Sequence, residues 1–95
     1  MYTFIILTRF SPATFEDQKK LRNMAMQVSK QIKKECPGIK WKGSYATFGR
    51  FDMVDVVEAD DPEEVAKAAM IIRSFGHATT ETLMGMPWNR FLKTL

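Results

Sequence analysis

Residues 43–64, GSYATFGRFDMVDVVEADDPEE, decide the fold because they contain two alternating segments, a turn between them and the start of a helix. Gly49 and Arg50 form the turn, and a Gly-X pair favours a two-residue type II′ hairpin. The segments 39–48 and 51–59 are therefore predicted to be antiparallel neighbours. So tight a turn predicts the cross-strand pairs Phe48–Phe51, Thr47–Asp52, Ala46–Met53, Tyr45–Val54, Ser44–Asp55, Gly43–Val56 and Trp41–Glu58.

The two faces of this hairpin differ in polarity. The more apolar face is predicted to lie under helices, and it carries Trp41, Tyr45, Val54 and Val56. The mixed face is typical of a pocket lining or an interface, and it carries Lys42, Ser44, Ala46, Phe48, Met53, Asp55 and Val57.

The acidic end of the stretch predicts a helix start. Asp61 is expected at the N-cap, Pro62 at the first helical position and Glu64 three residues after the cap, where they suit the free amides and the positive dipole. These carboxylates are therefore interpreted as helix-start chemistry, with Asp60 in a solvated loop. Gly76 is expected to end the helix in a left-handed conformation, and the buried stripe comprises Val65, Ala68, Ala69, Ile72 and Phe75.

The rest of the chain alternates between strands and helices. Residues 3–8, TFIILT, are apolar on both faces, as in a central strand. A helix follows within residues 11–38, where Thr14 with Asp17 resembles a capping box and Pro37 with Gly38 ends the helix. Residues 77–84, HATTETLM, predict a fourth strand. Apolar stripes are expected at Leu21, Met24, Val28, Ile32 and Cys36, and on a short C-terminal helix at Trp88, Phe91, Leu92 and Leu95.

This order is the ferredoxin-like βαββαβ layout of the α+β class: a four-stranded antiparallel sheet with two helices on one face, here followed by a short C-terminal helix. A chain of 95 residues suits one domain over residues 1–95. Its 45% hydrophobic and 26% charged residues are typical of a folded soluble protein.

Composition and motifs argue against several classes. No apolar run is long enough to span a bilayer, and MYTFIILTRF lacks the features of a signal peptide, so we expect a cytoplasmic protein that binds no membrane. Cys36 is the only cysteine and is interpreted as a packing residue at a helix end, not a nucleophile. Phosphate loops, zinc spacings and Ser-His-Asp orderings are absent, so the common catalytic classes receive no support. We expect no metal and no cofactor.

The net charge of +3 is modest. Its cations gather around the first helix and the next strand, where a solvated face is the default and an anionic partner the alternative. Residues 42–48, KGSYATF, faintly resemble the aromatic signature of RNA-recognition domains, but they lie on the second strand instead of the third, and a serine occupies a stacking position. Nucleic-acid binding is therefore not expected.

Two segments, FGRFDMVDVVEADDPEEVAKAA at 48–69 and FGHATTETLMGMP at 75–87, resemble the GYD domain family, small bacterial proteins named for a Gly-Tyr-Asp segment at the second hairpin. The resemblance extends over nearly the whole chain. Phe51 stands where the family has tyrosine, and Met84 with Gly85 replaces a basic and small pair. The family is similar to the dimeric α+β barrels, in which two ferredoxin-like sheets enclose a cavity, so the resemblance implies a fold more than an activity.

We expect a homodimer formed through the helix-free face of the sheet. The first strand is apolar on both sides, and Phe48, Met53 and Val57 would otherwise be exposed. The stripe of the C-terminal helix is expected to dock on its own domain or on the partner subunit.

Asp55 is the main candidate for a site residue, because it lies between Met53 and Val57 and beside Ser44. It is either an interface carboxylate paired with Lys40 or Lys42, or a buried acid or base with a raised pKa. Asp52 is interpreted as stabilising the turn through a hydrogen bond.

The fourth strand adds two further candidates. Glu81 shares a face with Thr79 and Leu83, and it lines the same cavity as Asp55 only if both face the same side. His77 is the only histidine; it is interpreted as a helix-to-strand junction residue, with haem binding or proton transfer as the alternatives.

Three functions stay open at this point. The first is a non-catalytic dimeric α+β barrel that binds a small, partly apolar molecule in a cavity lined by Ser44, Met53, Asp55 and Glu81. The second is a cofactor-independent enzyme, monooxygenase-like or isomerase-like, that uses Asp55 with Glu81 or His77. The third is a structural partner-binding module. A cavity with convergent polar groups favours the first two, and a dry, filled interface favours the third.

Overall fold

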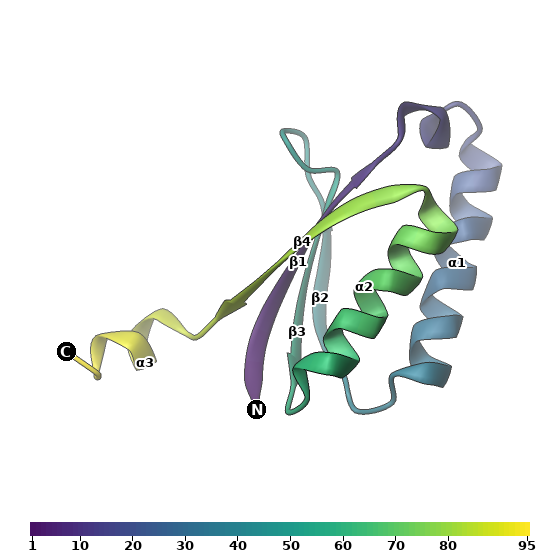
Figure 1. Cartoon of the computed structure of the whole chain (residues 1–95). Helices are drawn as coiled ribbons and strands as arrows, with labels where there is room; N and C mark the ends of the chain where they lie inside the picture. Colours follow the sequence, from purple (N-terminus) through teal and green to yellow (C-terminus); the bar gives the residue numbers. More distant parts are fainter.

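The computed structural model describes residues 1–95, except for the burial of Gly76. Its elements are β1 (Tyr2–Phe10), the 3-10 turn η1 (Pro12–Phe15), α1 (Gln18–Glu35), β2 (Lys40–Ala46), β3 (Met53–Ala59), α2 (Pro62–Gly76), β4 (Ala78–Gly85) and α3 (Trp88–Leu92) (Figure 1). The strands form one antiparallel sheet in the order β2-β3-β1-β4, and α1 and α2 lie on one side of it. The predicted ferredoxin-like fold with a short C-terminal helix is confirmed.

The register of β1 shows which face of the sheet lies under the helices. Ile6 pairs with Asp55 of β3 and with Thr82 of β4. Residues opposite each other in an antiparallel pair point to the same face. Because the side chain of Ile6 is completely buried, this common face is the one that the helices cover.

The predicted register of the hairpin is largely confirmed. Four pairs are observed as expected: Ala46–Met53, Tyr45–Val54, Ser44–Asp55 and Gly43–Val56. Trp41, however, pairs with Val57 instead of Glu58, because the register shifts between Trp41 and Gly43. A shift of one residue moves a side chain to the other face of the sheet. Trp41 therefore lies on the same face as Ser44.

The prediction of which hairpin face lies under the helices is wrong for Tyr45, Val54 and Val56, although the register shift places Trp41 on the helix-covered face. Asp55 and Val57 are buried on the helix-covered face, whereas Tyr45, Val54 and Val56 lie on the helix-free face. The segment Met53–Ala59 has apolar residues on both faces, so alternation alone does not distinguish them. Pairing with β1 decides the matter, since alternate residues of that strand face the helices.

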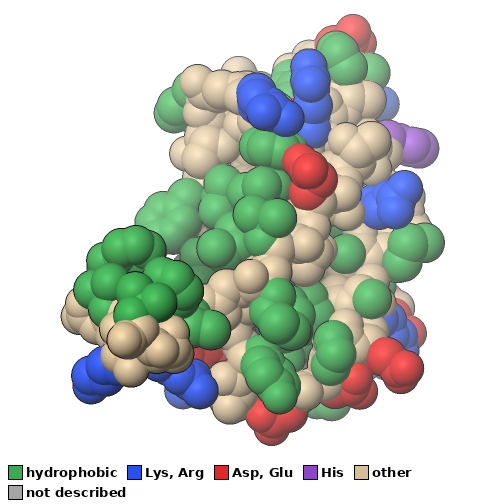
Figure 2. All heavy atoms as spheres, turned by 60° about the vertical axis from the view of Figure 1, so that its left-hand side comes forward, with side chains coloured by type: hydrophobic (Ala, Val, Ile, Leu, Met, Phe, Trp, Pro, Cys, Tyr) green, Lys and Arg blue, Asp and Glu red, His purple; other side chains and the backbone are tan. Residues whose placement is uncertain are grey.

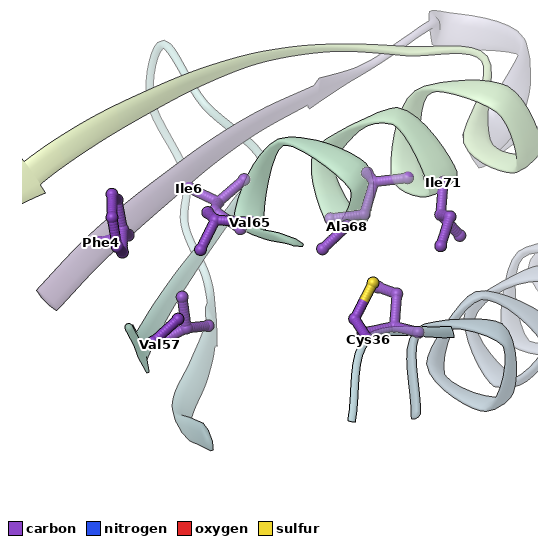
Figure 3. Close-up of a cluster of buried hydrophobic side chains, with 10 residues drawn as sticks. Phe4, Ile6, Cys36, Val57, Val65, Ala68 and Ile71 are labelled. Carbon is purple, nitrogen blue, oxygen red and sulfur yellow. The ribbon is translucent and has the colours of Figure 1, made fainter. Parts of the chain in front are cut away.

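The hydrophobic core fills the space between the sheet and the helices (Figure 3). Burying one large apolar side chain stabilises the fold by about 1.5–3 kcal/mol. The core residues are Phe4, Ile6, Val57 and Ala59 from the sheet, Val65, Ala68, Ile71 and Ile72 from α2, and Ile32 and Cys36 from the end of α1. Elsewhere on the α1 stripe Leu21, Met24 and Val28 stay half-buried, so α1 contributes mainly through its C-terminal end.

The helix starts follow local chemistry. Asp61 caps α2 as predicted, since its Oδ1 accepts a hydrogen bond from the Glu63 amide at 2.9 Å. The predicted capping box at Thr14 is wrong. The cap of α1 is Asp17, whose Oδ1 accepts from the amides of Lys19 and Lys20 at 3.0 and 3.2 Å. Residues 12–15 form the 3-10 turn before it.

The end of α2 also differs from the prediction. The left-handed residue at the helix end is His77, with φ of 46°, one position after the predicted Gly76. Histidine tolerates this conformation better than most residues with a side chain. The buried stripe of α2 is confirmed except at Phe75, which is exposed.

The hairpin loop over residues 47–52 is not the predicted type II′ turn, because Gly49 lacks the positive φ that this turn requires. Instead the Thr47 amide donates to the Asp52 carbonyl at 3.0 Å, and the Thr47 hydroxyl donates to the Phe51 carbonyl at 2.5 Å. β2 therefore ends at Ala46 and β3 begins at Met53, with the predicted register preserved next to the loop.

The C-terminal helix α3 projects away from the domain on the helix-free side of the sheet (Figure 1). Its apolar residues are exposed, with Trp88 at 68% and Leu95 just beyond the helix at 87%. The alternative that this stripe docks on its own domain is wrong, and docking on a partner subunit stays a prediction.

Candidate functional site

Asp55 forms a small polar cluster at the edge of the helix-covered face. Its side chain is 2% exposed, and its Oδ1 accepts hydrogen bonds from Ser44 Oγ at 2.5 Å and from Trp41 Nε1 at 3.2 Å. Trp41 Nε1 also lies 2.8 Å from Ser44 Oγ. The predicted pairing of Asp55 with a lysine is not observed, because Lys42 lies 3.9 Å from Glu58 instead.

The other oxygen of the Asp55 carboxyl has a different environment. Of the buried side-chain atoms that the structure describes, Asp55 Oδ2 and Thr8 Oγ1 are the two without a hydrogen-bond partner. Burial raises the pKa of the Asp55 carboxyl above its ordinary value, although the hydrogen bonds from Ser44 and Trp41 act in the opposite direction. Burial therefore makes the ionised form of this carboxyl less favourable than that of an exposed aspartate.

The structure does not bring the predicted acid and base residues together. Glu81 pairs with Leu7 and lies exposed on the helix-free face, opposite to that of Asp55. His77 is exposed at the start of β4, where its carbonyl accepts from the Ser11 amide at 3.1 Å. The hypothesis that Asp55 and Glu81 line one cavity is wrong for the single chain.

The two remaining ligand-binding candidates, Ser44 and Met53, lie on the same face of the sheet as Asp55. Ser44 and Met53 both face the helix-covered side of the sheet, Ser44 opposite Asp55 and Met53 opposite Ala46. Ser44 is exposed, since β2 is an edge strand that the helices cover incompletely, and Met53 at the beginning of β3 is half-buried.

Asp52 has a structural contact that differs from the predicted one. Its Oδ2 accepts from the Phe10 amide at 2.9 Å, and its own amide donates to the Thr8 carbonyl at 2.9 Å. These two bonds join the beginning of β3 to the end of β1. The interpretation of Asp52 as a structural residue is supported, but the bond links two strands and does not close the turn.

Cys36 lies in the core at the C-terminal end of α1. Burial, followed by the nearby Glu64 carboxylate, raises the pKa of its thiol above the ordinary value. The thiol therefore stays protonated and packs as an apolar group.

The hollows described on this surface lie away from the predicted site. One is a groove of about 230 Å³ between η1, the start of α1 and the end of α2, and its lining includes Leu21, Met24, Phe75 and His77. The other lies on the outer side of α1. Neither is lined by Asp55 or Glu81. Among the described residues, no cluster of acidic, histidine and cysteine side chains is suited to hold a metal ion.

The helix-free side of the sheet carries a group of partly exposed apolar side chains. We call it the open face, and its apolar residues are Ile5, Leu7, Tyr45, Val54, Val56 and Leu83. Tyr45 is 61% exposed and Leu83 49%. Polar residues such as Arg9, Glu58 and Glu81 share this face. Figure 2, which brings this side forward, shows hydrophobic side chains over its middle and α3 beside it.

The GYD domain family matches residues 4–95. The chain belongs to the GYD domain family. This confirms the resemblance seen in the hairpin and the threonine-rich strand. In this GYD domain, the Arg50 guanidinium in the hairpin loop lies 5.6 Å from the centre of the Phe51 ring.

A curated relative of this GYD domain comes from Thermus thermophilus. It is named glutamine synthetase and cystathionine beta-lyase binding protein, and it is 32% identical over 87 residues, which cover 92% of this chain and 90% of the relative. The name describes a protein that binds other proteins.

Solved structures support the fold of the GYD domain. The leucine response regulatory protein of Mycobacterium tuberculosis matches with a TM-score of 0.60 and 10% identity, over 90% of this chain and 51% of that one. A dimeric ferredoxin-like protein of unknown function from Thermobifida fusca matches with a TM-score of 0.50 and 13% identity, over 88% and 90% of the two chains. At these identities the likeness concerns the fold alone.

Sequence reasoning missed Trp41 as a hydrogen-bond donor to Asp55. The signal for Trp41 was Gly43, because a glycine inside a strand often marks a bulge. No helix among the described residues has both the length and the apolar character needed to cross a bilayer.

Proposed function

We propose that this GYD domain is a non-catalytic, homodimeric module that binds a metabolic enzyme. The observation that carries the proposal is the open face, an apolar surface with no partner in the single chain. Contiguous apolar surface of this kind marks an interaction site. Of the candidate acid and base residues, by contrast, Asp55 and Glu81 lie on opposite faces of the sheet and His77 is exposed at the end of α2, so the geometry supports protein binding better than catalysis.

The partner for the open face is a second copy of the chain. Two sheets that pack face to face bury their apolar residues about 10 Å apart, and a two-fold axis pairs the same patch with itself. The Thermobifida fusca protein is dimeric and shares the fold, which supports a dimer. In such a dimer the open faces are buried and the helices point outward.

The second partner is an enzyme of the kind named for the Thermus relative, a glutamine synthetase or a cystathionine β-lyase. The outer side of α1 suits an acidic docking surface. Met26 is 65% exposed among cations, so an apolar contact is surrounded by positive charge. These cations are Lys19, Arg22, Lys30, Lys33 and Lys34. Binding to either enzyme would place the domain in the cytoplasm.

The test uses the two enzymes purified from the host of this protein. Biolayer interferometry with the immobilised domain is expected to show micromolar or tighter binding to at least one enzyme, weakened by salt because exposed charges are screened. Lys30→Glu is expected to weaken this binding. Arg73→Glu, an exposed charge reversal on α2, is the matched control and should leave it unchanged.

Two results contradict the enzyme-binding proposal. One is the absence of binding to either enzyme at micromolar concentration. The other is equal weakening by Lys30→Glu and Arg73→Glu, which would show a general charge effect instead of a docking surface.

Small-molecule binding between the two sheets stays a prediction, but the residues that would line the cavity differ from those predicted. Asp55, Ser44 and Met53 face the helix side and do not line a space between open faces, whereas Glu81 does. Native mass spectrometry of the dimer from its own host distinguishes the cases. A retained small molecule favours the ligand-binding function, and an empty dimer favours the protein-binding module.

A further inference from the structure

The C-terminal segment of residues 86–95 forms an arm that no other element covers. It leaves β4 at Gly85 and carries the five-residue helix α3. Its large apolar side chains are all exposed, and they comprise Met86, Trp88, Phe91, Leu92 and Leu95. The rings of Trp88 and Phe91 lie 5.6 Å apart, so the arm presents a contiguous aromatic surface.

A helix this short is not stable by itself. Isolated helices below about 12–15 residues are marginal in water, and most helical stability in proteins comes from packing an apolar face. On α3 the apolar residues Trp88, Phe91 and Leu92 follow the spacing i, i+3 and i+4, while Arg90 lies on the opposite side. The arm therefore has one side suited to burial and one suited to solvent.

The position of the arm identifies its partner. Figures 1 and 2 place α3 on the helix-free side of the sheet, next to the open face. Met86 and Pro87 in extended form span about 7 Å, and five helical residues add about 7.5 Å. Packed sheets lie about 10 Å apart. The arm is therefore long enough to reach from one sheet to a second sheet packed on the open face.

We infer that each α3 arm packs on the other subunit of the homodimer, so that two copies exchange their C-terminal arms. This inference rests on the proposed dimer through the open face. The two-fold operation buries both unpartnered surfaces at once, the open face and the stripe of the arm. Pro87, with φ of −55° and ψ of 137°, holds the arm extended and away from its own domain.

The test follows Trp88 by fluorescence. The chain has two tryptophans, so Trp41→Phe leaves Trp88 as the only reporter. Light scattering on the same samples gives the oligomeric state over a dilution series. In the dimer, Trp88 emission is expected to be blue-shifted and protected from iodide quenching. On dilution to monomer, the emission should move to the red and quenching should increase.

Each outcome bears on a different proposal. A monomer at every concentration overturns both the dimer and the arm exchange. A dimer whose Trp88 is fully quenched overturns the arm exchange and leaves the dimer standing. Protection of Trp88 in the monomer shows that the arm folds on its own domain, which also overturns the exchange.

A pair of variants on the arm provides a test that keeps Trp41. Phe91→Ala is expected to weaken the dimer about tenfold, as expected for truncation of a buried aromatic anchor. Asn89→Ala, on the adjacent side of the same helix, is the matched control. Equal dimer dissociation constants for Phe91→Ala and Asn89→Ala would overturn the arm exchange even if the dimer itself is confirmed.

Discussion

Replacement of Leu83 by alanine tests the open face as the dimer interface. Leu83 lies on β4 opposite Ile5, and its side chain is 49% exposed in the single chain. The half that is already buried contributes to the fold of each subunit. The exposed half is the part that a second sheet would bury.

The expected magnitude follows from this division. Leucine to alanine removes three carbons, each worth about 0.8 kcal/mol when fully buried, or about 2.4 kcal/mol in all. Half of this, about 1.2 kcal/mol, is assigned to the interface in each subunit. Because the two-fold axis repeats the change, the dimer loses about 2.4 kcal/mol, and its dissociation constant rises roughly 50-fold.

Sedimentation velocity over a dilution series measures the dissociation constant directly. The matched control is Met70→Ala on α2, since Met70 is 55% exposed but lies on a helix instead of the open face. Met70→Ala is expected to leave the dissociation constant unchanged. A Leu83→Ala dimer as tight as the wild type, or equal weakening by the two variants, would refute the assignment of the open face as the interface.

Three further predictions concern the stability of the fold. Burial raises the pKa of Asp55, so the free energy of unfolding should fall as the pH rises from about 4, the ordinary pKa, through the raised pKa. Urea unfolding of Asp55→Asn should show no such fall with pH. If the variant and the wild type have the same pH profile, the raised pKa of Asp55 is contradicted. Asp52→Ala removes the acceptor for the Phe10 amide and should cost about 1.5 kcal/mol by urea unfolding, with the exposed Asp60→Ala near zero as control. Ile6→Ala leaves a cavity in the core and should cost about 2–5 kcal/mol by the same assay, whereas a loss below about 1 kcal/mol would show that Ile6 is not at its centre.

The elements that the sequence predicted well are those with local signals. Asp61 and Pro62 mark the start of α2, and Pro37 with Gly38 follows the end of α1, because caps and helix-ending residues act within a few positions of the chain. The capping box at Thr14 failed because Asp17 is also a good cap and lies next to the helix. Two adjacent signals of the same type cannot be ranked from sequence.

The candidate site was harder to predict than the fold. The parity of β4 was right, since Glu81 and Leu83 do share a face, and the pairing of Ser44 with Asp55 was right. Their relative placement was wrong, because the two strands do not pair with each other. β1 lies between β3 and β4, so the face that carries Asp55 on β3 can be related to the face that carries Glu81 on β4 only through the pairing of both strands with β1.

The sequence by itself determined the order of the elements, the cross-strand partners around Asp55 and the family. These properties depend on residue spacing and turn chemistry over short distances in the chain. Only the tertiary structure decided which face of the hairpin lies under the helices, where Trp41 points and that α3 stands apart from its domain. The physical reason is that β3 is apolar on both faces, so its orientation depends on pairing Asp55 with Ile6 of a strand distant in sequence. That pairing buries Asp55 in the core side of the sheet and leaves the valines at 54 and 56 on the open face.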